Sequence, residues 1–209
     1  MVAKASAVST HRIVQSRDPV DASPRDYLTE REMELFCKAA KHGRHGARDY
    51  AMVLLAYRHG LRVSELVEMR LDQLDWHTAH LWVARKKGSL STQHPLAGDE
   101  LRALRAWCRT RVRHPQHHLP YVFLSEHGPC TRQMFNYLVA AIGTRAGLLL
   151  HVHPHMLRPS CGYALANQGR DTRLIQDYLG HRNVQHTVRY TRTAAARFEG
   201  LWRSVEGDR

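Results

Sequence analysis

The sequence lacks long apolar runs and paired cysteines. No stretch approaches the roughly 20 apolar residues that a transmembrane helix needs, and the N-terminus lacks the apolar core of a signal peptide. The cysteines are scattered and form no CxxC motif, which is typical of reduced thiols in a cytosolic protein: Cys37, Cys108, Cys130 and Cys161. We therefore expect a cytoplasmic protein that neither enters a membrane nor depends on disulfides.

Several motifs of common chemistries are also missing. The chain contains no Walker A motif, no GxGxxG or GxSxG sequence, and no DDE-like or DxD set of carboxylates for two metal ions. The run HVHPH at 151–155 is rich in imidazoles, but no cysteine or carboxylate set completes a four-ligand zinc site. We therefore expect no metal and no cofactor.

Positive charge, in contrast, is abundant. Lys and Arg number 31 against 19 Asp and Glu, which gives a net charge of +12. This balance suits a polyanionic partner, nucleic acid first and an acidic membrane surface second, although solubility alone also explains it. With 209 residues, 43% of them hydrophobic, the chain is long enough for one domain with a real core.

Hydrophobic periodicity predicts a mainly α fold with a small antiparallel β-hairpin (α+β). Residues 1–27 have no periodicity and are expected to form a flexible, weakly basic tail. Thr29 and Glu32 form a capping box that predicts the start of a helix. A nearly all-apolar helix is predicted over 47–59, and such a helix is expected to lie at the centre of the core.

Two longer amphipathic helices follow, over 98–113 and from Thr131 to about 146. The predicted buried stripe of the first consists of Leu101, Leu104, Trp107, Cys108 and Val112. Between the core helix and these two, residues 80–96 read as a hairpin with Lys86 and Lys87 at its tip. A tip lysine can reach over a bound strand, but solvent exposure is the commoner reason for its presence there.

The stretch with the most candidate catalytic side chains runs from His155 to Tyr190 (HMLRPSCGYALANQGRDTRLIQDYLGHRNVQHTVRY). His155 and Arg158 are three residues apart and can point the same way from one helical turn. His181 follows Gly180, a predicted helix stop. Together these residues and the tyrosine can hold a phosphate and attack it.

Arg62 lies upstream, between the predicted helix stop at Gly60 and a new helix opened by Ser64 and Glu65. Taken alone, this position favours a plain ion pair with Glu65 or Asp72.

The order of these residues resembles the tyrosine recombinases (phage integrases). HGLRVSEL, a lysine hairpin, HMLR, LGH and a final Tyr-Thr follow one another as in that family, over roughly residues 28–205. The chain is most similar to the short recombinases that invert fimbrial promoter segments in enterobacteria. Pro159 departs from that group, which has histidine there; proline is tolerated in the first turn of a helix, so the fold should not change.

The resemblance implies a domain organisation. Residues 28–209 are expected to form the catalytic domain, with a C-terminal helix at about 192–205 that docks on a neighbouring subunit. We expect no separate N-terminal core-binding domain. The implied partners are double-stranded DNA with inverted-repeat sites, three further copies in a homotetramer, and accessory DNA-bending proteins, all at the bacterial nucleoid.

The resemblance also implies a role for each residue of the motif. Tyr190 is the expected nucleophile, which forms a 3′-phosphotyrosine without metal or ATP. Arg62 and Arg158 would clamp the phosphate. His155 is the expected proton acceptor, His181 a phosphate ligand, and Lys87 the proton donor to the leaving 5′-oxygen. Lys87 is preferred to Lys86 because the family lysine directly precedes a turn glycine.

Two other functions remain open from the residues. A type IB topoisomerase shares the tyrosine chemistry but relaxes DNA without exchanging strands. A DNA-binding regulator could keep the fold without activity, although the intact set of six residues argues against it. Cleavage and strand-exchange assays separate the three hypotheses.

Overall fold

A computed structural model describes residues 25–85, 90–192 and 194 of the chain. The fold is mostly helical with a small antiparallel sheet that contains the predicted hairpin, and it also has a second, two-stranded sheet that was not predicted. Its helices are α1 Glu30–Ala40, α2 Gly46–Arg58, α3 Val63–Val67, α4 Gly98–Arg111, α5 Arg132–Arg145, α6 Leu157–Asn167, α7 Thr172–Leu179 and α8 Gln185–Arg192, with short 3-10 turns η1 Leu71–Gln73 and η2 Pro154–Met156. The strands are β1 Leu74–Asp75, β2 His80–Val83, β3 Thr92–Pro95, β4 Leu124–Ser125 and β5 Gly128–Pro129.

Local rules explain where several helices begin and end. The capping box predicted at α1 is present, since Thr29 Oγ1 accepts from the Glu32 N–H at 3.3 Å and Glu32 Oε2 accepts from the Thr29 N–H at 2.8 Å. Thr131 caps α5 in the same way through the Met134 N–H. Gly180 ends α7 in the left-handed conformation, at φ 67°, as its position predicted.

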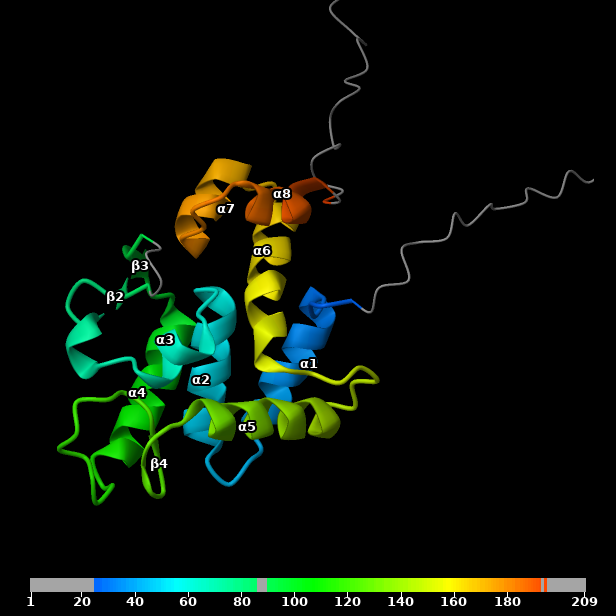
Figure 1. Ribbon diagram of the computed structural model, residues 1–209. Coiled ribbons are helices and arrows are strands. Elements are labelled where there is room, and N and C mark those ends of the chain that lie inside the picture. Colours follow the sequence, from blue (N-terminus) through cyan, green and yellow to red (C-terminus); the bar gives the residue numbers. More distant parts are fainter. Residues whose placement is uncertain (1–24, 86–89, 193, 195–209) are drawn as a thin grey trace, which may run out of the picture.

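The core helix is α2, as its apolar character predicted. Residues 51–56 of this helix are all buried. Figure 1 shows α2 in the middle of the molecule, between α1 and α4, with α5 running across one end. The three-stranded sheet, in the order β1-β2-β3, lies on the side of α3 and α4.

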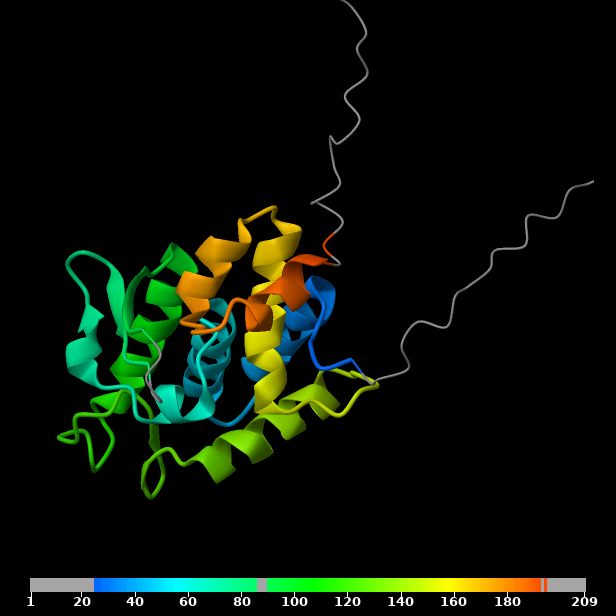
Figure 2. The same ribbon diagram turned by 45° about the horizontal axis from the view of Figure 1, so that its top comes forward.

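A second, smaller cluster of buried side chains lies where α6, α7 and α8 meet. It contains Cys161, Ile175, Leu179, Tyr190 and Ala194. Figures 1 and 2 both show α7 and α8 packed against α6, away from α5. The predicted nucleophile is therefore part of a core cluster and not of a loop.

Some predicted apolar positions are exposed instead. Val112, expected to be buried, is 63% exposed and directly follows α4, which ends at Arg111. Arg111 is buried in its place, and its guanidinium donates to the carbonyls of His117, Leu119 and Tyr121. A guanidinium with several carbonyl acceptors is stable at a position that periodicity assigns to an apolar residue.

Parts of the predicted organisation lie outside the described residues. These are the tail up to residue 24, the hairpin tip at 86–89, and the C-terminal helix beyond residue 194. The last residues assigned to the tail are described, however, and they contact the domain. Tyr27 stacks on Tyr163 with ring centroids 3.9 Å apart, and Arg25 lies 2.6 Å from Glu32.

A buried histidine in β3 gives the fold a pH dependence. His94 is 1% exposed; its Nε2 lies 2.7 Å from Thr92 Oγ1 and its Nδ1 3.1 Å from His59 Nδ1. Burial, with the nearby charges of His59 and Arg85, lowers the pKa of His94 to about 3. In the unfolded chain its pKa returns to about 6.5. Between these values the unfolded state binds a proton that the folded state does not.

We expect the free energy of unfolding to fall as the pH drops below 6.5. The neutral form of His94 stabilises the fold fully above that pH, and this contribution is lost on acidification at up to about 1.4 kcal/mol per pH unit. Urea denaturation at pH 7, 6 and 5 measures the slope. His94→Gln should make the free energy of unfolding depend less steeply on pH. His127→Gln, at an exposed position, should leave that slope unchanged. Equal slopes for the two variants would contradict the assignment.

Candidate active site

One pocket gathers most of the predicted catalytic residues. It has a volume of about 310 Å3 and is lined by Arg62, His155, Arg158, Pro159, His181, His186, Arg189 and Tyr190. Five of these are residues that the sequence singled out for catalysis. The sixth, Lys87, belongs to the segment 86–89 outside the described residues.

Arg158 lines the pocket and joins two helix ends. It lies in the first turn of α6, and its Nη1 and Nη2 donate to Gly60 O and Leu179 O, both at 2.5 Å. Gly60 follows α2 at φ 53°, where an added Cβ would lie 2.3 Å from Leu179 Cδ2, so a larger residue would push the two helix ends apart. Two of the five N–H groups of Arg158 are used in this way, and the residue also lines the pocket.

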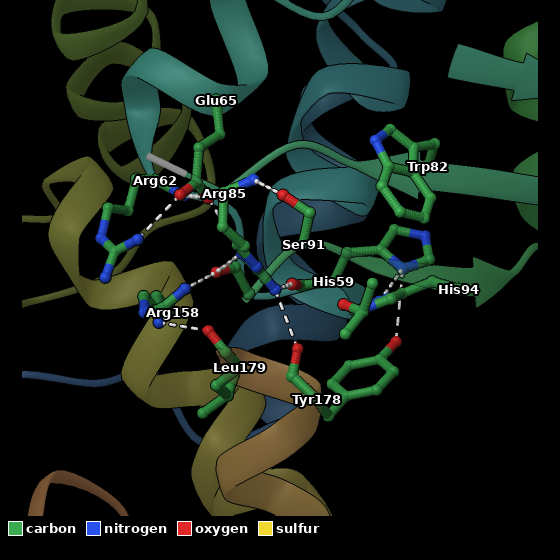
Figure 3. A network of polar contacts seen from close by, with 12 residues as sticks. His59, Arg62, Glu65, Trp82, Arg85, Ser91, His94, Arg158, Tyr178 and Leu179 are labelled. Carbon is green, nitrogen blue, oxygen red and sulfur yellow. Dashed lines mark hydrogen bonds and ion pairs between the residues drawn. The ribbon is translucent and has the colours of Figure 1, made fainter. Parts of the chain in front are cut away.

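Arg62 lies beside Arg158, at the start of α3. Its Nη1 donates to Glu65 Oε1 at 2.8 Å and its backbone N–H to Glu65 Oε2 at 2.9 Å. The pairing with Glu65 that its position suggested is therefore present, and Arg62 still lines the pocket. Glu65 also accepts from Arg85 Nη1 at 2.9 Å, so one buried carboxylate orients two guanidinium groups (Figure 3).

Positive charge exceeds negative charge in this cluster. Burial, together with repulsion from Arg85 and Arg62, lowers the pKa of Arg158 to about 10, so the group stays charged at neutral pH. Burial raises the pKa of Glu65, but Arg85 and the hydrogen bonds from Arg62 outweigh this effect and hold it below its usual range. Three guanidinium groups around one carboxylate produce an excess charge that favours a bound anion.

His181 is held in its neutral form. Burial and the nearby charges of Arg158 and His186 lower its pKa to about 3. Its Nδ1 lies 2.9 Å from Thr187 Oγ1, a fully buried hydroxyl, within hydrogen-bonding distance. The backbone carbonyl of His181 accepts from Gln176 Nε2 at 2.9 Å. Thr187 therefore orients the ring and Gln176 fixes the backbone beside it, while His181 lines the pocket.

His155 and Pro159 complete the wall formed by η2 and α6. His155 is exposed in the middle of η2, two residues before α6 begins. The sequence placed it on one helical turn with Arg158; in the structure the two lie on adjoining helical turns and line the same pocket. Pro159 is buried in the first turn of α6, where proline is tolerated, as predicted.

Tyr190 lies on α8 with its ring packed into the protein. The residue is 2% exposed, and its ring meets Tyr163 edge to face, with centroids 5.1 Å apart. Gly162 lies against the other part of the ring: an added Cβ there would come within 2.5 Å of Tyr190 Cδ2. The glycine is thus required for the present position of the tyrosine.

A charged residue contacts the tyrosine hydroxyl. Arg189 Nη2 donates to Tyr190 Oη at 3.3 Å, and its guanidinium carbon lies 4.9 Å from the ring centroid. Asp26, just before α1, lies 3.4 Å from Arg189 Nη2. Burial lowers the pKa of Arg189, but Tyr190 and Asp26 raise it by more, so the net shift is upward. Arg189 is therefore a permanent positive charge beside the phenol oxygen.

Replacing Gly162 with alanine should slow any reaction of Tyr190. The added methyl group forces the ring to move, and displacements of about 1 Å at a reacting group can reduce a rate by about a hundredfold. If Tyr190 is the nucleophile that the resemblance implies, the variant should form less covalent adduct on a denaturing gel, while its DNA affinity in a gel shift stays near wild type. Gly98→Ala is a matched control, because its Cβ would meet only Arg102 Nη1 at 3.3 Å. Similar rates for both variants would show that the ring position does not matter.

Sequence reasoning missed several residues of the site. Arg85, Thr187, Arg189 and Gly162 all contact predicted site residues, yet none was singled out. Only Arg189 had a sequence signal, as the cation next to the final tyrosine. The others act through contacts that neither spacing nor periodicity reveals.

Two further properties concern only the described part of the chain. No group of three or more His, Cys, Asp or Glu side chains in it is arranged to hold a metal ion. Nor does it contain a helix of the length and apolarity needed to cross a bilayer.

Comparison with known proteins gives consistent matches. The phage integrase family matches residues 26–197. The type 1 fimbriae regulatory protein FimB of Escherichia coli K12 is 46% identical over 192 residues, 91% of this chain and 96% of FimB. FimE of the same strain is also 46% identical, over 86% of this chain and 92% of FimE.

Solved structures agree in fold. XerA recombinase has a TM-score of 0.70 at 27% identity, over 79% of this chain and 59% of XerA. The catalytic domain of bacteriophage HP1 integrase has a TM-score of 0.59 at 17% identity, over 83% of this chain and 90% of that domain. The chain thus spans little more than half of XerA but nearly all of an isolated catalytic domain.

Proposed function

The chain belongs to the phage integrase family of tyrosine recombinases, and we propose that its pocket holds one phosphate of double-stranded DNA while Tyr190 attacks it. One observation carries the proposal: the phenol and the side chains of Arg62, Arg158, His155 and His181 line a single pocket with excess positive charge.

The similarity to FimB and FimE identifies the biological class. Identity of 46% over at least 86% of this chain and 92% of each relative makes it a site-specific tyrosine recombinase that controls fimbrial phase variation. We propose that it does so by inverting a promoter segment between inverted-repeat sites. The assembly on DNA is proposed to be a homotetramer, helped by accessory DNA-bending proteins, in the cytoplasm at the nucleoid.

The first chemical step is attack on phosphorus. A phosphodiester repels nucleophiles because it is negatively charged, and the guanidinium groups of Arg62 and Arg158 compensate for that charge and for the charge that develops in the transition state. The oxygen of Tyr190 forms a bond to phosphorus and its proton passes to His155. Arg189, which donates to the same oxygen, stabilises the phenolate as it forms.

The step is completed when the bond from phosphorus to the 5′-oxygen breaks. Lys87 is proposed to give the leaving 5′-oxygen a proton, which produces a 5′-hydroxyl and a 3′-phosphotyrosine. His181, neutral and oriented by Thr187, is proposed to donate a hydrogen bond to a phosphate oxygen. The energy of the broken bond is retained in the phosphotyrosine, so a 5′-hydroxyl from another strand reverses the step without ATP.

A plasmid inversion assay tests the function. The plasmid carries a promoter that faces a reporter, flanked by candidate inverted repeats taken from the DNA beside the gene. Purified protein in EDTA should invert the segment, with restriction mapping as the readout. Relaxation of supercoils without inversion would indicate the topoisomerase alternative, and binding without a covalent adduct would indicate the regulator. Activity that EDTA abolishes and Mg²⁺ restores would refute the metal-free mechanism.

A further inference from the structure

A second arginine spans the same two helix ends as Arg158. The side chain of Arg85 is completely buried, and its Nη2 donates to His59 O and Tyr178 O, both at 2.9 Å. Its Nη1 donates to Gly60 O at 3.2 Å and to Glu65 Oε2 at 2.9 Å. Arg85 thus has four acceptors from three separate parts of the chain (Figure 3).

Three of these acceptors belong to helix ends. His59 and Gly60 follow α2, and Tyr178 lies in the last turn of α7. The last carbonyls of a helix lack intrahelical donors and carry partial negative charge, so a cation is favourable beside them. Arg158 uses the neighbouring carbonyls of Gly60 and Leu179. The two guanidinium groups together hold α2 and α7 at a fixed separation.

Removing Arg85 would leave buried hydrogen-bond acceptors without one of their donors. The carbonyls of His59 and Tyr178 would lose the guanidinium that donates to them, and Glu65 would lose its ion pair with Arg85. Such groups strongly favour a new donor when water cannot reach them. Arg158 already lies at these helix ends. If its guanidinium reoriented to donate to the vacated carbonyls, those N–H groups would no longer face the pocket.

We propose that Arg85 is a positioning residue for DNA cleavage: it occupies the carbonyls at the ends of α2 and α7, so that Arg158 keeps its position and its remaining N–H groups for the phosphate. This inference rests on the proposed function. The backbone N–H of Arg85 also donates to Ser91 Oγ at 3.0 Å, which ties the base of the hairpin to the same helix ends. Arg85 itself lines no part of the pocket and does not touch the phosphate site.

The chain offers a matched control in Arg111. This arginine is also buried and also donates to three backbone carbonyls, but at the end of α4 and without a pocket residue among its partners. Arg85→Met and Arg111→Met remove the same group and keep similar volume. If burial alone explains Arg85, both variants should lose stability and neither should lose cleavage rate when folded.

Cleavage is measured as covalent adduct formation in a single turnover at saturating DNA, at a temperature where each variant is folded by circular dichroism. We expect Arg85→Met to bind DNA like wild type but to cleave about a hundredfold more slowly, the effect of misplacing reacting groups by about 1 Å. Arg111→Met should cleave close to the wild-type rate. Equal rates for the two variants would overturn the proposal.

A second substrate distinguishes an effect of Arg85 on the arginine clamp from a general loss of rigidity in the protein. In a methylphosphonate at the scissile position, a methyl group replaces one charged oxygen, so the reaction depends less on the arginine clamp. The defect of Arg85→Met relative to wild type should then shrink. A defect of the same size on both substrates would mean that Arg85 does not act through the clamp.

The remaining outcomes also decide between hypotheses. If Arg85→Met does not fold, Arg85→Lys serves instead, because an ammonium keeps the charge but cannot reach four acceptors in the plane of a guanidinium. It should show the same substrate dependence, and a wild-type rate would refute the inference. If wild type itself forms no adduct, or Tyr190→Phe still forms one, the proposed function fails independently of Arg85.

Discussion

Replacing Tyr190 with phenylalanine is expected to abolish covalent attachment of the protein to DNA and to leave DNA affinity nearly unchanged. The substitution removes the one oxygen that is proposed to bond to phosphorus, but it keeps the ring that fills the cluster with Cys161, Ile175 and Leu179. The fold should therefore be retained. A denaturing gel detects the adduct, and a gel shift measures the affinity.

Tyr163→Phe is the matched control for this experiment. Tyr163 is the aromatic neighbour of Tyr190, and the variant removes a hydroxyl from the same region. It should still form the adduct. An adduct with the Tyr190 variant would mean that another side chain is the nucleophile, and the assignment of the whole pocket would have to be abandoned.

The second large effect is expected for Arg158. Arg158→Ala should reduce cleavage by a hundredfold or more, because a preorganised charge contact to the transition state contributes about 3 kcal/mol. The variant also removes donors from Gly60 O and Leu179 O, and each buried carbonyl left unpaired costs about 1–3 kcal/mol of stability. Rates must therefore be compared per folded molecule, by calibrating the folded fraction with circular dichroism.

Arg158→Lys separates charge from geometry. It keeps the positive charge, but an ammonium cannot span two carbonyls and hold a phosphate with a planar fork, so it should fail nearly as badly. Arg173→Ala, at an exposed position on α7, removes an equal charge away from the pocket and should remain active. Near-normal cleavage by either Arg158 variant would contradict the phosphate clamp.

The sequence was informative wherever an interaction is local. Thr29 caps a helix that begins at the next residue, and Gly180 ends one that stops just before it, so a few residues contain the whole cause. The pocket residues could be named because their motifs resemble a known family in order and spacing. Their gathering into one pocket agrees with that resemblance, while their roles remain proposals.

Long-range contacts could not be predicted in this way. Arg85 binds Glu65, 20 residues before it, and Tyr178, 93 residues after it, and no periodicity relates these positions. The contact of Asp26 with Arg189 joins opposite ends of the described chain. A buried arginine such as Arg111 even contradicts the apolar pattern of its helix, because several carbonyls of a following loop stabilise it.

If Tyr190 is the proposed nucleophile, its packing has a consequence for which DNA end can travel during recombination. Its ring lies in the interior cluster formed by α6, α7 and α8, and it packs directly against the backbone at Gly162. A strand joined to its oxygen is then anchored to the body of the protein, and the 3′ end moves only when the whole domain moves. The 5′-hydroxyl end has no such anchor. Strand exchange would therefore proceed by migration of free 5′ ends between stationary 3′ ends.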